Sequence, residues 1–260
     1  MPDTELVVAP TLEGAVRWVA DTIVADSVAA IADHAAFHLC LAGGSTPRDL
    51  YVLLSSPLWR TRIEWERVHL YVGDERYVGA ADPRSNFRMI RESLVDRILV
   101  PPRNIHPMPT SSGDPDADAE RYEKVLRDNL PAGPEGVPRF DVVLLGLGND
   151  GHTASLFPGS PALDETTRLV VGVSPPSAPT PRITLTPGVI NAAARVVVLT
   201  AGTLKAGALR CMLAEHGTPH DIPARVLDPD HGSLCVSVDL AACSELDAEP
   251  LLDGIVTIRL

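Results

Sequence analysis

Apolar and polar residues alternate along the chain in a pattern that predicts strands and helices in succession. Residues 5–9 alternate weakly, as in an edge strand, whereas residues 12–32 carry apolar side chains at helical spacing. The apolar residues of this helical stretch include Val16, Val19, Ile23 and Val28. Residues 37–42 form a short apolar run that stops at a glycine turn, and residues 48–54 after the turn again have helical spacing. The sequence therefore predicts a strand, a glycine turn and a helix in this order.

The same order of strand and glycine turn occurs three more times. The expected strands and the glycines after them are Val68–Val72 with Gly73, Val142–Leu145 with Gly146, and residues 196–200 with Gly202. Such repetition predicts an α/β protein in which helices cover both faces of a mostly parallel sheet. We expect a last strand at residues 254–260 and, because no long linker interrupts the pattern, one domain over residues 1–260.

Helix start signals occur between these strands. Ser85 is a good N-cap for a helix with one apolar face, and residues 116–130 form a second amphipathic stretch. The apolar face after Ser85 is expected to hold Phe87, Ile90, Leu94 and Ile98. Thr186 and Pro187 predict a further helix, with the threonine as cap and the proline at the first helical position. Two segments rich in proline and serine are short enough to be surface loops: residues 107–115 and 174–181.

Charge and composition exclude several classes of protein. The 260 residues carry a formal net charge of −12 and no basic run, so nucleic acids and anionic membranes are not expected partners. The acidic N-terminus lacks the basic region of a secretory signal, and no uncharged stretch reaches about 20 residues. We therefore expect a cytoplasmic protein. The four cysteines have no CxxC spacing, which favours reduced thiols in the core: Cys40, Cys211, Cys235 and Cys243.

The first glycine turn is a candidate phosphate site. Ligands of an open parallel sheet bind beyond the carboxyl ends of its strands, where this turn lies. Gly43 and Gly44 let the backbone approach a ligand, Ser45 and Thr46 add hydroxyls, and a helix N-terminus follows. The alternative is a tight turn that only starts the helix.

Charged residues follow two other strands. Asp74, Glu75 and Arg76 follow Gly73 at the end of Val68–Val72, although a solvated turn would serve there equally well. Only two of the 22 basic residues are lysines, so Lys205, just past residues 196–200, is a candidate for a specific role. A compact ammonium suits a phosphate group, and the alternative is a lysine on a helix surface.

The third glycine turn, GLGNDGHT at residues 146–153, satisfies the dinucleotide pattern G-x-G-x-x-G. That interpretation fails because Pro158, Gly159 and Pro161 leave no room for the long helix of a dinucleotide fold. The glycines are better explained as bringing Asp150 and His152 to a site. An aspartate two residues away orients or tunes an imidazole that acts as general base.

The remaining histidines do not predict a metal site. His216 and His220 are four residues apart, but the glycine and proline between them break the helix that such metal spacing needs. Five others stand alone in the sequence, and each is expected to be structural or exposed: His34, His38, His69, His106 and His231.

Six segments together resemble the 6-phosphogluconolactonases, in order over about residues 5–240. They are LAGGSTPRDLY (41–51), VGDERYV (72–78), SNFRMIRESL (85–94), LLGLGNDGHTASLFPGS (144–160), RITLT (182–186) and TLKA (203–206). The glucosamine-6-phosphate deaminases of the same superfamily share the glycine turn, the acidic pair and the aspartate–histidine element. In a deaminase, however, a glutamate follows the histidine by five residues. Here that position is Phe157, in an expected short helix at 153–157.

The resemblance implies a Rossmann-like αβα sandwich that hydrolyses 6-phospho-D-glucono-1,5-lactone without a cofactor or a metal. It implies that His152 is the general base and Asp150 its orienting partner. Gly43, Gly44, Ser45 and Thr46 would bind the phosphate together with Lys205. Arg76 and Arg182 would contact phosphate or lactone oxygens, and the sequence does not divide these two roles between them. Asp74 would bind sugar hydroxyls.

Two alternatives to a lactonase remain. One is a sugar-phosphate deaminase or isomerase of the same superfamily, which Phe157 disfavours. The other is the non-catalytic effector domain of a sugar-phosphate-responsive regulator. Such regulators carry a DNA-binding helix pair, whereas only about 35 residues, acidic in character, precede the first expected core strand here.

Overall fold

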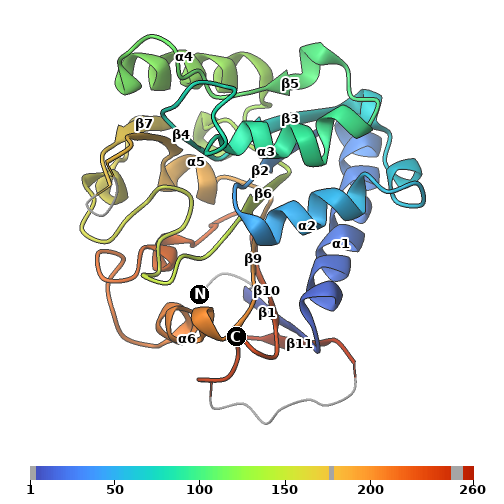
Figure 1. The fold of residues 1–260 in the computed structure, drawn as a ribbon, viewed down its shortest axis with the longest axis vertical. Helices are drawn as coiled ribbons and strands as arrows, with labels where there is room; N and C mark the ends of the chain where they lie inside the picture. Colours follow the sequence, from blue (N-terminus) through green and yellow to red (C-terminus); the bar gives the residue numbers. More distant parts are fainter. Residues whose placement is uncertain (1–3, 176–178, 247–253) are drawn as a thin grey trace.

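The computed structural model describes residues 4–175, 179–246 and 254–260, and its largest element is an eight-stranded sheet (Figure 1). The strand order is β11 (Val256–Arg259), β1 (Thr4–Ala9), β10 (Ser233–Asp239), β9 (Arg195–Thr200), β6 (Val142–Leu145), β2 (Phe37–Leu41), β3 (Val68–Val72) and β5 (Ile105–His106). All neighbouring pairs are parallel except β1 and β11. The expectation of a mostly parallel sheet is confirmed.

One strand prediction is wrong, and a strand of the large sheet was missed. β1 is not an edge strand, because β11 pairs with it in antiparallel orientation and supplies the edge. β10, between β1 and β9, was not predicted at all. Ser237 interrupts its apolar run, which hides the strand in the sequence. In the structure Ser237 is buried, and its hydroxyl donates to the carbonyl oxygen of Ala15 at 3.3 Å.

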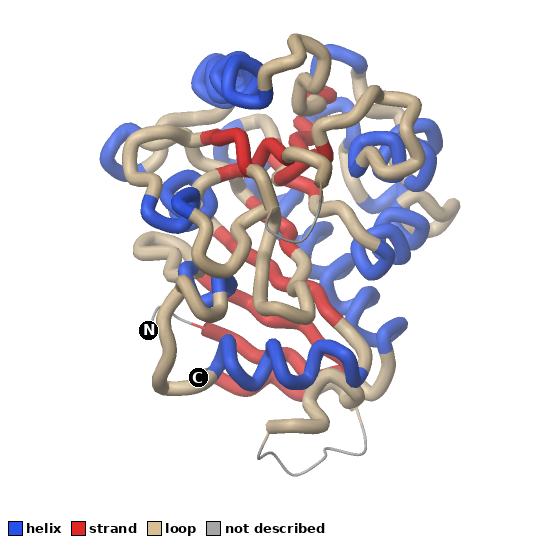
Figure 2. The backbone as a smooth tube through the Cα atoms, turned by 60° about the vertical axis from the view of Figure 1, so that its left-hand side comes forward, coloured by secondary structure: helices blue, strands red, loops and turns tan. Residues whose placement is uncertain are grey.

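Helices cover both faces of the large sheet, as the sequence predicted. α1 (Leu12–His34) contacts β1, β2, β9 and β10, and α2 (Ser45–Leu54) packs on α1. Figure 1 shows these two helices on one side of the sheet and α5 (Pro187–Asn191) and α6 (Ala206–Leu213) on the other. In Figure 2, α6 crosses in front of the strands. Val16, Val19 and Ile23 of α1 are buried as expected, but Val28 is 61% exposed.

The other helix predictions hold in part. The Ser85 hydroxyl accepts from the Arg88 N–H at the start of α3 (Asn86–Ser93), but the helix ends before Ile98. α4 (Pro115–Asn129) is capped by Asp114 and packs on a second, small sheet. Thr186 stands at the N-cap of α5, yet its hydroxyl donates to the Arg168 carbonyl instead of capping the helix. Of the two expected loops, residues 107–114 and the described part of 174–181 lie outside helices and strands, while residues 176–178 lie outside the described residues.

The small sheet was not predicted. It consists of β4 (Asp74–Arg76), β8 (Arg182–Leu185) and β7 (Val170–Val173), all antiparallel. The residues after β3 were expected to be a charged turn, but they form β4. An acidic pair within a three-residue strand gives no alternation that would reveal it. The small sheet brings Arg182 opposite Arg76, 106 positions apart in the numbering.

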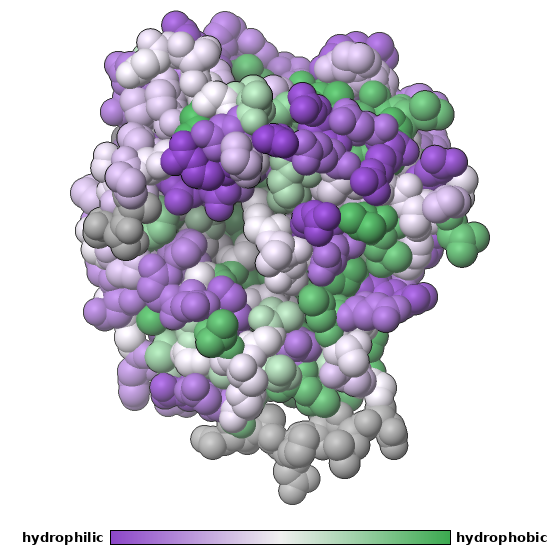
Figure 3. Space-filling view, viewed as in Figure 1, coloured by the Kyte–Doolittle hydropathy of each residue, from purple (hydrophilic) through white to green (hydrophobic). Residues whose placement is uncertain are grey.

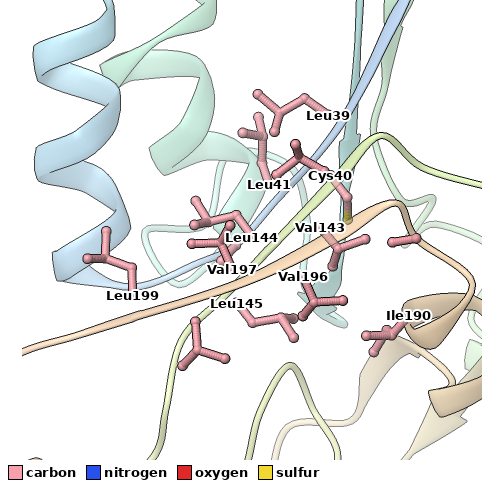
Figure 4. Close-up of a cluster of buried hydrophobic side chains, with 14 of the residues drawn as sticks. Leu39, Cys40, Leu41, Val143, Leu144, Leu145, Ile190, Val196, Val197 and Leu199 are labelled. Carbon is pink, nitrogen blue, oxygen red and sulfur yellow. The ribbon is translucent and has the colours of Figure 1, made fainter. Parts of the chain in front are cut away.

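The core lies on both faces of β2, β6 and β9 (Figure 4). The register pairs Cys40 with Val143 and Val143 with Val196, so these three side chains share the face that Ile190 of α5 covers. All four are fully buried. The parallel strands are therefore buried on both sides, which explains their continuous apolar sequences.

The surface is mostly hydrophilic in the view of Figure 3, with apolar residues in small groups. Within the described ranges, no helix is both long enough and apolar enough to cross a membrane. The cytoplasmic location and the single domain stay predictions. The four cysteines are free thiols, of which Cys40 and Cys235 are buried.

Histidines that stand alone in the sequence meet in the structure. His38 on β2 lies beside His69 on β3, with ring centroids 4.9 Å apart, and His69 Nδ1 lies 3.2 Å from Nε2 of His106 on β5. His38 Nδ1 lies 3.2 Å from the Tyr71 hydroxyl. Burial, followed by the charges of neighbouring histidines, lowers the pKa of His38 to about 3. The cluster is therefore neutral in the folded protein near neutral pH.

We predict that this cluster makes the fold sensitive to acid. In the unfolded chain His38 binds its proton near its ordinary pKa of 6.5, but in the folded chain only near pH 3. Between these pH values the unfolded state binds more protons, so stability falls as pH falls. H38Q, which keeps a polar group near Tyr71, should flatten the decline in Tm between pH 6.5 and 4. H216Q, at an exposed histidine, serves as control. Equal slopes in H38Q and the unmodified protein would contradict this prediction.

Candidate active site

The loops after four neighbouring strands meet at one edge of the large sheet. β9, β6, β2 and β3 are adjacent and parallel, so their carboxyl ends lie side by side. The loops enclose an open cavity of about 570 Å³. All ten candidate site residues from the sequence line it: Gly43, Gly44, Ser45, Thr46, Asp74, Arg76, Asp150, His152, Arg182 and Lys205. The structure thus brings the candidates together, while their individual roles stay predictions.

The N-terminus of α2 opens onto this cavity. The helix begins at Ser45, three residues earlier than expected, so Ser45 and Thr46 belong to its first turn. Gly44, the N-cap, has φ 105°, a backbone conformation that favours glycine, and no side chain caps the helix. The first N–H groups of a helix have no partner within it and carry a partial positive charge. This end of the cavity therefore suits an anion.

The loop after β6 holds an aspartate–histidine pair. His152 Nδ1 lies 2.5 Å from Asp150 Oδ1, and the backbone N–H of His152 donates to the same oxygen at 3.2 Å. Gly148 makes room for both side chains, because a Cβ there would lie 2.1 Å from His152 Nδ1. The contact at Nδ1 leaves Nε2 as the ring nitrogen that can take a proton from a ligand or a water.

The segment after His152 is not the expected short helix. Residues 153–157 form a turn closed by an isolated bridge between Thr153 and Leu156, and Ala154 has φ 46°. The Thr153 hydroxyl donates to the Gly146 carbonyl at 2.9 Å, which ties the turn back to the start of the loop. The turn places the ring of Phe157 against His152, with centroids 4.8 Å apart.

Charges within the cavity influence one another. Burial raises the pKa of Asp150, but the charge and hydrogen bonds of His152 outweigh it and hold that pKa below its ordinary value. Asp150 is therefore ionised at neutral pH. Burial lowers the pKa of Lys205, and the Asp150 carboxylate opposes this shift. Lys205 thus lies within electrostatic reach of the aspartate–histidine pair.

Two arginines lie side by side at the cavity. Arg76 of β4 is the register partner of Arg182 of β8, and both line the cavity. The Nε atoms of both are buried and have no hydrogen-bond partner among the described residues. Burial, and then the charge of Arg76, lowers the pKa of Arg182. Like charges directly opposite each other across a strand pair are destabilising, and a bound anion would relieve this repulsion.

Asp74 is held by residues that the sequence did not reveal as part of the site. Its Oδ2 accepts from the Ser155 hydroxyl at 2.6 Å, and its Oδ1 accepts from Asn86 Nδ2 at 3.2 Å. Asn86 also lines the cavity. In the sequence Asn86 is only the residue after a helix cap, and Ser155 is a small residue in a turn, so neither gave a signal. In the described part of the chain, no three His, Cys, Asp or Glu side chains are placed to hold a metal ion.

A cationic cavity with an aspartate–histidine pair, at the carboxyl edge of a parallel sheet, is the arrangement of an α/β enzyme for a small anionic molecule. Residues 10–236 match the family model described as Glucosamine-6-phosphate isomerases/6-phosphogluconolactonase. The chain belongs to this family. The resemblance found in the sequence and the expectation of an enzyme are confirmed.

Relatives agree over most of the chain. It is 42% identical over 217 residues to the 6-phosphogluconolactonase of Synechocystis sp., covering 84% of this chain and 88% of the relative. With the 6-phosphogluconolactonase of Nostoc sp. it shares 37% identity over 247 residues, 95% and 96% of the two chains. The solved structure of 6-phosphogluconolactonase from Trypanosoma brucei superposes with a TM-score of 0.82 at 34% identity, covering 95% of this chain and all of that one. The Rossmann-like αβα sandwich is confirmed by these matches.

The short contact between Asp150 and His152 should be detectable in solution. We predict a strongly downfield proton resonance for a hydrogen bond of this length, which D150N should remove. G148A should also remove it, because the added Cβ would lie 2.1 Å from His152 Nδ1 and displace the ring. G146A is a matched control in the same loop, since a Cβ there meets nothing within 4 Å. A resonance that persists in G148A would show that the pair does not need this glycine.

Proposed function

We propose that the protein hydrolyses 6-phospho-D-glucono-1,5-lactone to 6-phospho-D-gluconate, the second step of the oxidative pentose phosphate pathway. The observation that carries the proposal is the Asp150–His152 pair beside a group of cations in one cavity. The names of the relatives support it, since these proteins are 6-phosphogluconolactonases.

A lactone of this kind is an activated ester, so a base and an oxyanion donor are enough for its hydrolysis. His152 Nε2 takes a proton from water as the water oxygen attacks the lactone carbonyl carbon. Asp150, bonded to Nδ1, holds the imidazole in place and stabilises its protonated form. An arginine of the Arg76 and Arg182 pair stabilises the negative oxygen of the tetrahedral intermediate. The ring carbon–oxygen bond then breaks, and the proton on His152 passes to the ring oxygen.

Substrate binding uses the cations and the α2 N-terminus. We assign the phosphate to Lys205 and the backbone of the glycine turn, where Gly43, Gly44, Ser45 and Thr46 lie. Asp74 accepts hydroxyl groups of the sugar. Because the whole chain has a net charge of −12, it repels a phosphorylated sugar at long range. Local attraction inside the cavity is therefore essential to the proposal.

Phe157 favours a lactonase over a deaminase. The ring is 6% exposed and packs on the imidazole of His152. A deaminase is expected to carry a glutamate at this position, and an apolar ring cannot pass on a proton. An effector domain without catalysis would not need an ionised aspartate bonded to an imidazole with a free Nε2.

The first prediction concerns the base. H152A should lower kcat by about 10²–10⁴-fold with a much smaller change in KM, because the base acts on the reaction and does not bind the substrate. Rates are measured against the spontaneous hydrolysis of the lactone. A loss of less than about threefold would remove His152 from the mechanism.

A second prediction concerns the phosphate. K205A should raise KM for the phosphorylated lactone and hardly change the weak hydrolysis of unphosphorylated gluconolactone, because the contact is to the phosphate alone. K124A, at an exposed lysine paired with Asp128, is the matched control. Equal losses on both substrates would mean that Lys205 does not bind phosphate.

A third prediction separates the two activities of the family. The unmodified protein should release no ammonia from glucosamine 6-phosphate in a coupled assay. F157E should weaken the lactonase, because it removes the apolar ring that packs on the His152 imidazole and puts a carboxylate beside it, and it need not create a deaminase. Ammonia release by the unmodified protein at a rate comparable to lactone hydrolysis would replace the proposal with a deaminase.

A further inference from the structure

Asn86 connects two parts of the cavity that belong to different strands. Its Nδ2 donates to the backbone carbonyl of Asp74 at 2.8 Å and to Asp74 Oδ1 at 3.2 Å. A backbone carbonyl oxygen can only accept, so the 2.8 Å bond to it fixes which end of the amide faces Asp74. The amide oxygen therefore points away from Asp74. It is buried and has no hydrogen-bond partner among the described residues.

The amide oxygen lies against Gly43. A Cβ on Gly43 would be 2.0 Å from Asn86 Oδ1 and 2.2 Å from its Cγ, far closer than any real contact. Gly43 is the first glycine of the turn after β2, to which we assign the phosphate. The amide of Asn86 is thus confined between that turn and Asp74, which we assign to the sugar hydroxyls.

The backbone of Asn86 is equally fixed. Its N–H donates to Glu75 Oε1 at 2.7 Å, and the N–H of Phe87 donates to Glu75 Oε2 at 2.8 Å. Asn86 is 2% exposed. Because both its backbone and its amide are held, any movement of Gly43 toward Asp74 would have to displace a buried, hydrogen-bonded group.

We propose that Asn86 is a positioning residue, whose amide sets the separation between the phosphate-binding turn and Asp74. The amide acts through Gly43 and Asp74 and does not touch the reacting atoms. The separation decides whether a ligand can place its phosphate and its sugar hydroxyls at once. Asn86 thereby favours ligands whose phosphate lies at one fixed distance from the sugar ring. This inference rests on the proposed function, because it takes the phosphate site from it.

The first test compares ligands with and without phosphate. N86A should raise KM for the phosphorylated lactone roughly threefold to tenfold, the effect of one misplaced contact, and change kcat/KM for gluconolactone much less. The matched control is N104A, which truncates another buried asparagine whose Nδ2 donates to the backbone carbonyls of Glu66 and Val68, outside the cavity. N104A should lower Tm without changing the ratio of kcat/KM for the two substrates. A purely structural role of Asn86 would make N86A behave like N104A.

The second test is a double-mutant cycle. G43A should weaken binding of the phosphorylated substrate about as much as N86A, because its Cβ pushes the amide off Asp74. In G43A/N86A the Cβ meets no amide, so the double variant should be no worse than the poorer single variant. Losses that multiply in the double variant would overturn the inference. G43A also keeps the test open if N86A does not fold.

Calorimetry separates this inference from the proposed function. Binding of 6-phosphogluconate and of gluconate is measured for the same variants and requires no turnover. If the unmodified protein hydrolyses no lactone, the proposed function fails. The positioning role still stands in that case if N86A selectively weakens the binding of 6-phosphogluconate and the double-mutant cycle is non-additive. If N86A weakens both ligands alike or neither, the positioning role fails whatever the activity.

Discussion

The arrangement of the site depends on the hydrogen bonds to the buried carboxylate of Glu75. It is 2% exposed, and it accepts hydrogen bonds from the N–H groups of Arg76, Asn86 and Phe87 and from the Ser85 hydroxyl. Burial raises its pKa, and these four bonds oppose that shift. A carboxylate at a helix N-terminus is also stabilised by the helix dipole. Glu75 thus joins β4 to α3. Its neighbours Asp74, Arg76 and Asn86 are thereby held where they line the cavity.

The cavity concentrates positive charge in a protein that is acidic overall. Arg76 and Arg182 face each other across β4 and β8, Lys205 enters from the loop after β9, and the α2 N-terminus adds a partial charge. Such an arrangement costs stability in the absence of an anion, because the repulsion is held in place by the small sheet. Functional sites commonly contain residues that lower the stability of the protein, and the rest of the fold compensates for this loss.

The sequence predicted the elements that repeat a simple pattern. Apolar runs followed by glycine located β2, β3, β6 and β9, and nine of the ten candidate residues lie in the segments just after these strands, whereas Arg182 lies on β8. The sequence did not predict contacts made between distant segments. The small sheet depends on the pairing of Asp74–Arg76 with residues more than a hundred positions away, and no local periodicity records that pairing. The cluster of His38, His69 and His106 was missed for the same reason, because it depends on the register between strands. Asn86 was missed because its importance lies in contacts with Asp74 and Gly43, which lie outside its own helix.

The small number of groups around His152 suits the proposed reaction. One side of the imidazole is bonded to Asp150, and Phe157 covers the ring, so a single nitrogen remains for proton transfer. An activated ester needs one proton taken from water and returned to the ring oxygen, and one base can do both in turn. Opening an amino sugar and releasing ammonia requires more proton transfers, and Phe157 supplies none. The sheet and the cationic cavity could serve both reactions of the family. Phe157, which lies against the histidine, therefore favours lactone hydrolysis over deamination in the proposed function.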